Sequence, residues 1–300
     1  MKRTAMVMTT ALLSITAWAR TQAYGQAAPQ TAPATPPAGQ TTAAQPAAPT
    51  ASAAKRPPQA KTQPELDAYN AVAALKDPAA LEKGGEDFAI KFPDSELRKL
   101  LYQAAMRTYQ AANNGERTEA VGRKVLSMDG DDPEALVIVA EVISERTRDS
   151  DLDKDQRYDE AQKMAQKATQ TVETDVVFNA GTPQEKIDAY KSLLRSNAYS
   201  VMGTIDFKKD NFVGAQDNLQ KSIDAYPAQP DPVVVLRLAI SLDKQTKYPD
   251  ALKVANRAVE LTPEGSQLGT LARQERNRLQ QLTGGTAPPS TQPQAQPPKN

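Results

Sequence analysis

The chain contains no cysteine and no histidine among its 300 residues. These two absences exclude thiol catalysis, histidine bases, Ser-His-Asp triads and zinc sites built from Cys or His. A metal site would need oxygen ligands only. An enzyme would have to use carboxylate, lysine or tyrosine chemistry, and no pattern of such groups stands out. Because no disulfide can form within the chain, its stability must come from packing.

Net charge, aromatic residues and long apolar runs are also scarce. Lys plus Arg and Asp plus Glu each number 36, so the formal net charge is zero, and aromatic residues make up 5%. A nucleic-acid-binding protein usually carries a basic surplus or patch, so no nucleic-acid partner is expected. The apolar run from Ala5 to Ala19 is shorter than the roughly 20 residues that span a bilayer.

The first residues have the pattern of a secretory signal. Lys2 and Arg3 precede the apolar run, and small residues that suit cleavage follow it. We interpret residues 1–25 as a signal peptide that is cleaved after Ala19 or Gly25, with an uncleaved anchor as the alternative. No transmembrane segment is then expected in the mature chain. Export favours a bacterial periplasm, with secretion or outer-membrane association as alternatives, and the lack of cysteine excludes a lipoprotein.

Two segments of low complexity flank the remainder of the chain. Residues 26–63 consist almost entirely of Ala, Pro, Thr and Gln, and residues 284–300 are similar. Such segments bury too little apolar surface to offset the entropy lost on ordering. We therefore predict a disordered Ala/Pro-rich linker at 26–63 and a disordered tail at 284–300.

The residues between these segments show helical periodicity. Apolar residues recur three or four positions apart, as Leu101, Ala105 and Tyr109 do, and no alternating strand pattern of useful length is present. The sequence therefore predicts an all-α fold.

Three helix starts are marked by residues that favour capping. Asp132-Pro133 and Asp231-Pro232 each place an acidic cap before a proline, which is favoured in the first helical turn. The segment Thr182–Glu185 has the pattern of a capping box, with Thr182 as the cap and Pro183 as the first helical residue.

Two stretches in the C-terminal half repeat one pattern. A small residue is followed nine positions later by an aromatic residue, then by a second small residue, and a proline ends the unit. The matched pairs are Gly203 and Ala239, Phe212 and Tyr248, Ala215 and Ala251, and Pro227 and Pro263. Small residues at these positions would let two helices approach closely, and the proline cannot continue the second helix.

This pattern resembles the tetratricopeptide repeat (TPR) family, whose unit is a 34-residue helix–turn–helix. The resemblance implies a right-handed superhelical solenoid of antiparallel helix pairs. Two degraded copies precede the two clear ones, and the segment "FPDSEL" resembles TPR proteins of the bacterial envelope. The implied order is an N-terminal TPR-like unit at 64–98, an array over 99–265 with units near 99–132, 133–173, 183–229 and 232–265, and a capping helix at 266–283.

Alternating acidic residues between Asp149 and Glu160 have the rhythm of an EF-hand calcium loop. The sixth position of that frame is Lys154, where an EF-hand needs glycine. The spacing from Ala140 to Ala161 is 21 residues where the repeat expects 12, so the acidic stretch falls on an insertion at a turn. We expect a solvated loop and no metal site, with calcium binding kept as the alternative.

The TPR resemblance also implies a partner-binding groove lined by the first helix of each unit. The corresponding positions are Gln103, Arg107, Gln110, Val137, Glu141, Ser200, Thr204, Lys208, Leu236, Ile240 and Lys244. Some TPR domains grip a C-terminal carboxylate with Lys, Asn and Arg in this groove. The positions that match that set are Gln103, Arg107, Ile138, Asn197 and Val201, which do not reproduce it.

These observations favour a non-catalytic protein–protein interaction scaffold of the bacterial cell envelope. It would bind a partner peptide or helix in a concave groove and would need no cofactor. A subunit of an envelope assembly or division complex is the alternative, and a carboxylate-based enzyme is a third class. The sequence leaves the partner and the oligomeric state open.

Overall fold

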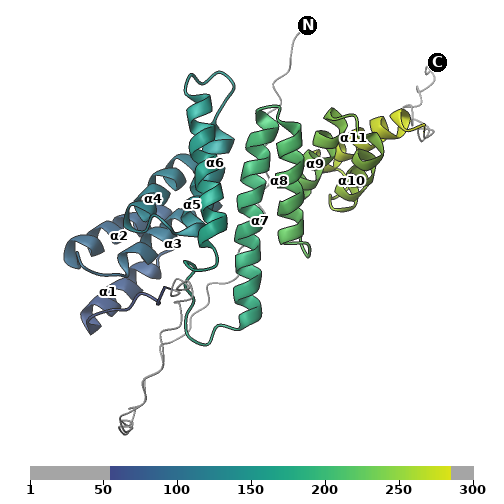
Figure 1. Cartoon of the computed structure of the whole chain (residues 1–300). Coiled ribbons are helices and arrows are strands. Elements are labelled where there is room, and N and C mark those ends of the chain that lie inside the picture. Colours follow the sequence, from purple (N-terminus) through teal and green to yellow (C-terminus); the bar gives the residue numbers. More distant parts are fainter. Residues whose placement is uncertain (1–54, 285–300) are drawn as a thin grey trace, which may run out of the picture. The chain divides into compact units, whose positions relative to one another are not determined.

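The structure is a computed structural model that describes residues 55–284 (Figure 1). Over this range the chain forms α-helices and no strand, which confirms the all-α prediction there. The helices are α1 (Gln63–Ala73), α2 (Pro78–Lys91), α3 (Arg98–Ala111), α4 (Gly115–Met128), α5 (Pro133–Arg146), α6 (Lys154–Thr171), α7 (Gln184–Lys208), α8 (Phe212–Ala225), α9 (Pro232–Lys244), α10 (Tyr248–Glu260) and α11 (Gln267–Leu282).

Two of the expected features fall mostly outside this range. The predicted signal peptide and the tail from residue 285 lie outside the described residues. Within residues 55–284, no helix combines the length and the apolar character that a membrane crossing requires.

Helices that follow one another in the chain pack against each other throughout the described range. Most odd-numbered helices also contact the next odd-numbered helix: α1 contacts α3, α5 contacts α7, α7 contacts α9, and α9 contacts α11. Among residues 55–284, no pair of even-numbered helices makes a comparable contact. One side of the stack is therefore built from odd-numbered helices, and each predicted unit overlaps one odd–even pair. The exact unit boundaries stay a prediction.

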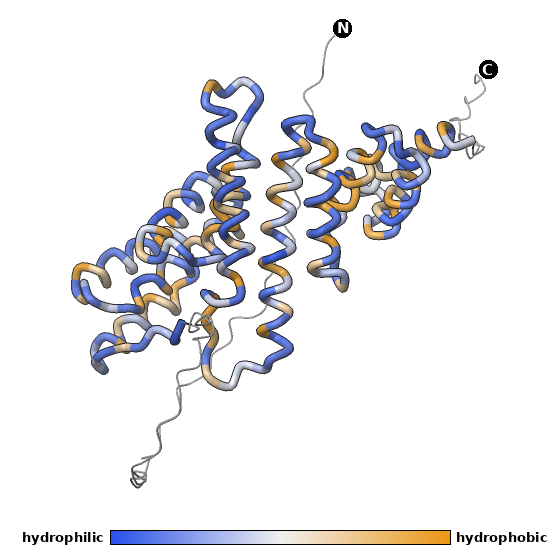
Figure 2. Tube along the Cα trace, in the orientation of Figure 1, coloured by the Kyte–Doolittle hydropathy of each residue, from blue (hydrophilic) through white to orange (hydrophobic). Residues whose placement is uncertain are grey.

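Apolar positions are interspersed with hydrophilic ones along the helices (Figure 2). Helix α5 is the most deeply buried, with ten of its residues shielded from solvent. It packs against α4, α6 and α7. A helix covered on several sides must be apolar around most of its circumference, and the run from Ala135 to Ile143 meets that demand with a single interruption at Glu141.

Three turns between paired helices share one backbone geometry. The middle residue of each turn lies in the left-handed region, with φ of 55° at Asn113, 56° at Asp210 and 60° at Thr246. The next residue donates its amide to the carbonyl five positions earlier, at 3.0, 2.9 and 3.0 Å respectively. This is the closure that ends many helices. The same turn is thus built three times, in the pairs α3–α4, α7–α8 and α9–α10.

Paired helices approach closely wherever one partner is small. A Cβ atom at Gly203 of α7 would lie 2.7 Å from Cγ of Leu219 on α8. In the α3–α4 pair the arrangement is reversed, because Met106 is the large residue and Gly122 is the small one, with the added Cβ only 3.2 Å from Sδ. The two pairs therefore have a similar combined side-chain volume, although the glycine lies on the first helix in one pair and on the second helix in the other. Close packing requires such a match.

Helix starts agree with the sequence at two of the three predicted sites. Asp132 Oδ1 accepts from the amide of Ala135 at 3.0 Å, and Asp231 Oδ1 accepts from Val233 at 2.8 Å. The predicted cap at Thr182 is wrong. Helix α7 begins one residue later than predicted, after Pro183, and the Thr182 hydroxyl instead donates to the carbonyl of Asn179 at 2.8 Å. The hydroxyl closes a turn in the preceding connection, so it is not available as a helix cap.

The acidic stretch between α5 and α6 is part loop and part helix. The connection covers residues 147–153, and α6 starts at Lys154, so the insertion lengthens both the turn and the second helix. Leu152 at the tip is fully exposed. The predicted position of the insertion, at the turn within one helix pair, is confirmed.

The predicted disordered linker, 26–63, extends too far toward the C-terminus. Residues 55–62 lie against the helices, although they contain no large apolar side chain. Lys55 forms ion pairs with Asp129 and Asp175, and Arg56 forms one with Glu96. The reason for the error is that ion pairs, together with the small apolar contact of Ala60 on the Phe88 and Leu97 cluster, hold this segment.

Replacing Thr246 by glycine should stabilise the protein. A β-branched residue at positive φ is strained by about 1 kcal/mol, and glycine removes that strain, although it makes the unfolded chain more flexible. We expect the free energy of unfolding to rise by about 0.5 kcal/mol in urea titrations. Asn113→Gly is the matched control and should change it little, because asparagine tolerates this conformation. A loss of stability in Thr246→Gly would contradict the strain argument.

Replacing Gly203 by alanine should destabilise the protein, although alanine favours helices. The new Cβ would meet Leu219 on both its side chain and, at 3.0 Å, its backbone nitrogen. Overpacking costs about 1–3 kcal/mol, against a helix-propensity gain of about 1 kcal/mol. A net loss of about 1 kcal/mol is expected in chemical denaturation. Gly130→Ala, where an added Cβ has only ordinary contacts, should leave stability nearly unchanged.

Candidate partner-binding surface

The eleven groove positions predicted from the sequence all lie on odd-numbered helices. Gln103, Arg107 and Gln110 are on α3, Val137 and Glu141 on α5, Ser200, Thr204 and Lys208 on α7, and Leu236, Ile240 and Lys244 on α9. Because α5 contacts α7, α7 contacts α9, and side chains of α3 reach the start of α5, these helices bring most of the positions to one side of the stack.

Four of these positions do not line an accessible surface. Val137, Thr204 and Leu236 are only 1%, 5% and 2% exposed, and Gln103 is 8% exposed. Val137 packs with Leu136 in a core cluster. The family pattern placed these residues on the groove, but each helix here is covered by neighbours on more than one side, which turns them inward.

The α3 positions are engaged within the protein. Arg107 makes two hydrogen bonds of 2.5 Å to the carboxylate of Glu134, next to the start of α5. The Glu134 charge raises the pKa of Arg107 above its ordinary value. Gln103 is buried and donates to Asp132 Oδ2 at 2.7 Å. These pairs tie α3 to α5, where the backbones themselves have few contacts, so both residues act first as connections between units.

The positions that remain most available cluster on α5, α7 and α9. Glu141 and Ser200 are partly exposed, as are Lys208 and Ile240, and Lys244 is exposed. Lys208 donates to the backbone carbonyl of Ser144 on α5, and its ammonium lies 5.7 Å from the centre of the Tyr158 ring.

Arg237 of α9 joins this cluster and was missed by sequence reasoning. Its guanidinium donates to the hydroxyl of Thr204 on α7 at 3.0 Å. A signal for it was present, because Arg237 is the only charged residue between Pro232 and Asp243 of a strongly apolar helix. A lone charge inside an apolar run is costly unless it meets polar groups, so it marks a polar site between helices.

Both cations of this cluster are held in an environment that disfavours their charge. Burial lowers the pKa of Arg237, and nearby Asp231 and Glu145 offset only part of the effect. Burial also lowers the pKa of Lys208, and the Arg237 charge adds to the shift. We define Glu141, Lys208 and Arg237 as the polar cluster. It offers hydrogen-bond donors from α7 and α9 beside a carboxyl from α5.

Glu141 is the carboxyl of the polar cluster, and its pKa is raised to about 8 from an ordinary 4.5. Burial is the main cause, and the charges of Glu145 and Asp231 add to it. Gln110 donates to its Oε2 at 3.3 Å. At neutral pH this carboxyl is therefore largely protonated and able to donate a hydrogen bond itself.

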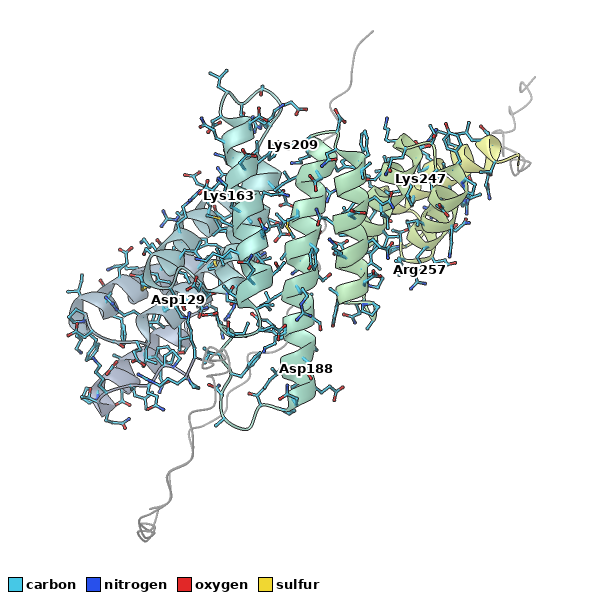
Figure 3. All side chains as sticks on the ribbon, viewed as in Figure 1. Asp129, Lys163, Asp188, Lys209, Lys247 and Arg257 are labelled. Carbon is cyan, nitrogen blue, oxygen red and sulfur yellow. The ribbon has the colours of Figure 1, made fainter. Side chains whose placement is uncertain are left out.

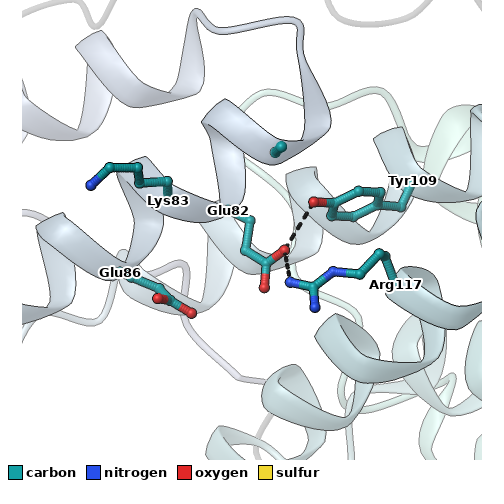
Figure 4. Close-up of a pocket in the computed structure, with 6 residues that line it drawn as sticks. Glu82, Lys83, Glu86, Tyr109 and Arg117 are labelled. Atoms are coloured by element: carbon teal, nitrogen blue, oxygen red, sulfur yellow. Dashed lines mark hydrogen bonds and ion pairs between the residues drawn. The ribbon is translucent and has the colours of Figure 1, made fainter.

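A shallow hollow of about 380 Å³ lies elsewhere, between α2, α3 and α4 (Figure 4). Its central carboxylate, Glu82, accepts from the Tyr109 hydroxyl at 2.9 Å, from Arg117, and from Lys124 at 3.3 Å. Burial alone would raise the pKa of Glu82, but these hydrogen bonds outweigh it and lower the pKa below the ordinary value. A carboxylate held this way joins three helices and is poorly matched to proton transfer at neutral pH.

The acidic loop does not bring its carboxylates together. Glu160, the twelfth position of the calcium frame, lies on α6 and pairs with Arg123 of α4 at 2.7 Å. Asp151 accepts from the amide of Arg148 at 2.8 Å. In the range 55–284, no group of three or more acidic, histidine or cysteine residues is placed to hold a metal ion.

The raised pKa of Glu141 predicts how stability changes with pH. The folded state favours the neutral form of Glu141. Its contribution to the free energy of unfolding is therefore complete below the unfolded pKa near 4.5, and it is lost as the pH rises through about 8. Glu141→Gln removes this loss. We expect the variant to gain about 1–2 kcal/mol relative to the wild type between pH 5.5 and pH 9, a value reduced for partial exposure.

Urea titrations at several pH values measure this effect, with Glu116→Gln on the exposed start of α4 as the control. A constant difference between Glu141→Gln and the wild type across that range would contradict the raised pKa.

Comparison with protein families and with curated proteins identified no relative of this chain. No protein-family model matches the chain, and no curated protein matches it.

Proposed function

We propose that this chain is an exported, non-catalytic scaffold of the TPR type that binds a partner peptide or helix on its odd-numbered helices. The superhelical form and the concave groove belong to this proposal. A bacterial cell envelope is the proposed location, because the first 25 residues have the signal pattern.

One observation carries the proposal above the others. The same left-handed turn closes three helix pairs, and the first helices contact one another from α5 to α7 and from α7 to α9, while side chains of α3 reach the start of α5. A stack of equivalent pairs presents a continuous row of first-helix side chains, and an extended or helical partner can follow such a row.

The chemistry of the polar cluster supports a peptide as the bound partner. Lys208 donates to a backbone carbonyl and Arg237 donates to a hydroxyl, and a guanidinium has five N–H groups and an ammonium three. A neutral Glu141 adds another donor. Ile240 supplies a partly exposed apolar neighbour on α9. Backbone carbonyls and apolar side chains of a peptide match these groups.

The alternative is a dedicated subunit of an envelope assembly or division complex, which would use the same surface with one stoichiometric partner. A carboxylate-based enzyme has less support, since the carboxylate in the hollow, Glu82, is fully engaged with protein donors.

Site-specific photo-cross-linking in cells tests the proposal. A photoreactive amino acid is placed at Ser200 or Lys244 on the odd-numbered helices, and at Asp217 or Lys253 on the even-numbered ones as matched controls. Cross-linked partners captured only from Ser200 and Lys244 would support the groove. Equal capture from all four positions, or from the controls alone, would contradict it.

The same material distinguishes the alternatives. One dominant partner at near-equal stoichiometry favours a complex subunit, whereas several partners favour a general scaffold.

The intact mass of the purified chain reports whether a signal has been removed after Ala19 or Gly25.

A further inference from the structure

A lysine ammonium is seated between two carboxylates that follow the C-terminal ends of α4 and α6. Lys55 Nζ lies 2.7 Å from Asp129 Oδ1 and 2.6 Å from Asp175 Oδ1. Asp129 follows α4, and Asp175 belongs to the connection between α6 and α7 (Figure 3 labels Asp129). The Lys55 amide also donates to the carbonyl of Thr174 at 3.3 Å.

The next residue is held in a similar way. Arg56 makes a two-pronged contact with Glu96, just before α3, at 2.9 and 2.5 Å. Pro57 and Pro58 follow, and the amide of Gln59 donates to Glu96 at 3.3 Å. We call residues 55–59 the strap, and Glu96, Asp129 and Asp175 the acidic notch. The notch therefore holds a basic pair, Lys55 and Arg56, which two prolines follow in the chain.

The acidic notch has more carboxylate than the helices themselves neutralise. The side chains of Asp129 and Asp175 are only 15% and 14% exposed. Lys99 of α3 is the other cation at Asp129, and it is shared with Asp132. Without Lys55, two largely shielded carboxylates would face each other within one ammonium's reach, an arrangement that costs free energy through desolvation and like-charge repulsion.

Titration behaviour agrees with this geometry. Burial alone would lower the pKa of Lys55, but its hydrogen bonds to Asp129 and Asp175 outweigh burial and raise the pKa. Burial alone would raise the pKa of Asp129, yet Lys55 and Lys99 together lower it. The notch thus stabilises a cationic occupant.

We propose that the acidic notch is a recognition site for a basic Lys-Arg segment, and that the chain's own strap fills it as an internal ligand. The strap is held by side-chain ion pairs and few backbone bonds, so it exchanges with a free peptide of the same kind. This site is separate from the proposed partner surface on α5, α7 and α9. Because Thr174 and Asp175 belong to the α6–α7 connection, an incoming basic segment also releases the strap from that connection.

A peptide titration on the full chain tests the proposal. The probe is a fluorescent peptide with the sequence of residues 54–61, AKRPPQAK. It should bind the variant Lys55→Ala/Arg56→Ala at least about ten-fold more tightly than the wild type, because a tethered strap competes at an effective concentration near millimolar. A peptide in which only the residues that match Lys55 and Arg56 are replaced by alanine is the matched control and should not bind.

Two further results decide the site. Adding Asp129→Asn and Asp175→Asn to the strap variant should weaken binding at least about ten-fold. Equal affinity for wild type and strap variant, no binding to the folded strap variant, or binding that survives the asparagine substitutions would each overturn the proposal. Circular dichroism confirms that the variants fold.

A second measurement remains decisive if the strap variant fails to fold. Trypsin must take the Lys55 side chain into its own pocket, so cleavage after Lys55 in the wild type should be slow relative to cleavage after exposed Lys61. In Asp129→Asn/Asp175→Asn the ratio of the two rates should rise at least about ten-fold. An unchanged ratio means that the notch does not hold Lys55, and the proposal fails.

Discussion

The close approach of neighbouring helices is the constraint on which the rest of this structure depends. A helix pair of this size cannot bury its apolar side alone, so each pair needs the next one. Approach is close where a glycine faces a large residue, as Gly203 faces Leu219. Without cysteines to cross-link the chain, these contacts supply the stability. They also decide which side chains stay accessible, because stacking covers parts of the odd-numbered helices as well as the even-numbered ones.

Polar groups complete the connection between units where apolar contact is sparse. Gln103 and Arg107 reach from α3 to the start of α5, and Glu82 gathers donors from α3 and α4. Partly buried polar groups must find such partners, since an unpaired one costs more than a hydrogen bond contributes. The polar cluster on α5, α7 and α9 is different, because burial lowers the pKa of both of its cations and neighbouring carboxylates offset only part of that effect. That contrast separates connecting side chains from the side chains that we propose for binding.

The two proposed sites use charge in opposite ways. The acidic notch holds a cation of its own chain between two shielded carboxylates, so an external ligand has to compete with the strap. The polar cluster instead places two cations, from α7 and α9, beside a carboxyl from α5. A basic segment and a peptide backbone could therefore bind at different places on the same chain. Each site follows from which charges the fold leaves incompletely matched.

The sequence by itself determined the all-helical class, the caps at Asp132 and Asp231, and the insertion before α6, because these depend on neighbours within a few positions. It also indicated the repeat through Gly203 and Ala239. Only the tertiary structure decided that Val137, Thr204 and Leu236 are covered, that Arg237 meets Thr204, and that Lys55 lies between Asp129 and Asp175. These outcomes depend on contacts between residues far apart in the chain. A local sequence pattern carries no information about which distant charge or side chain a residue contacts in the folded protein.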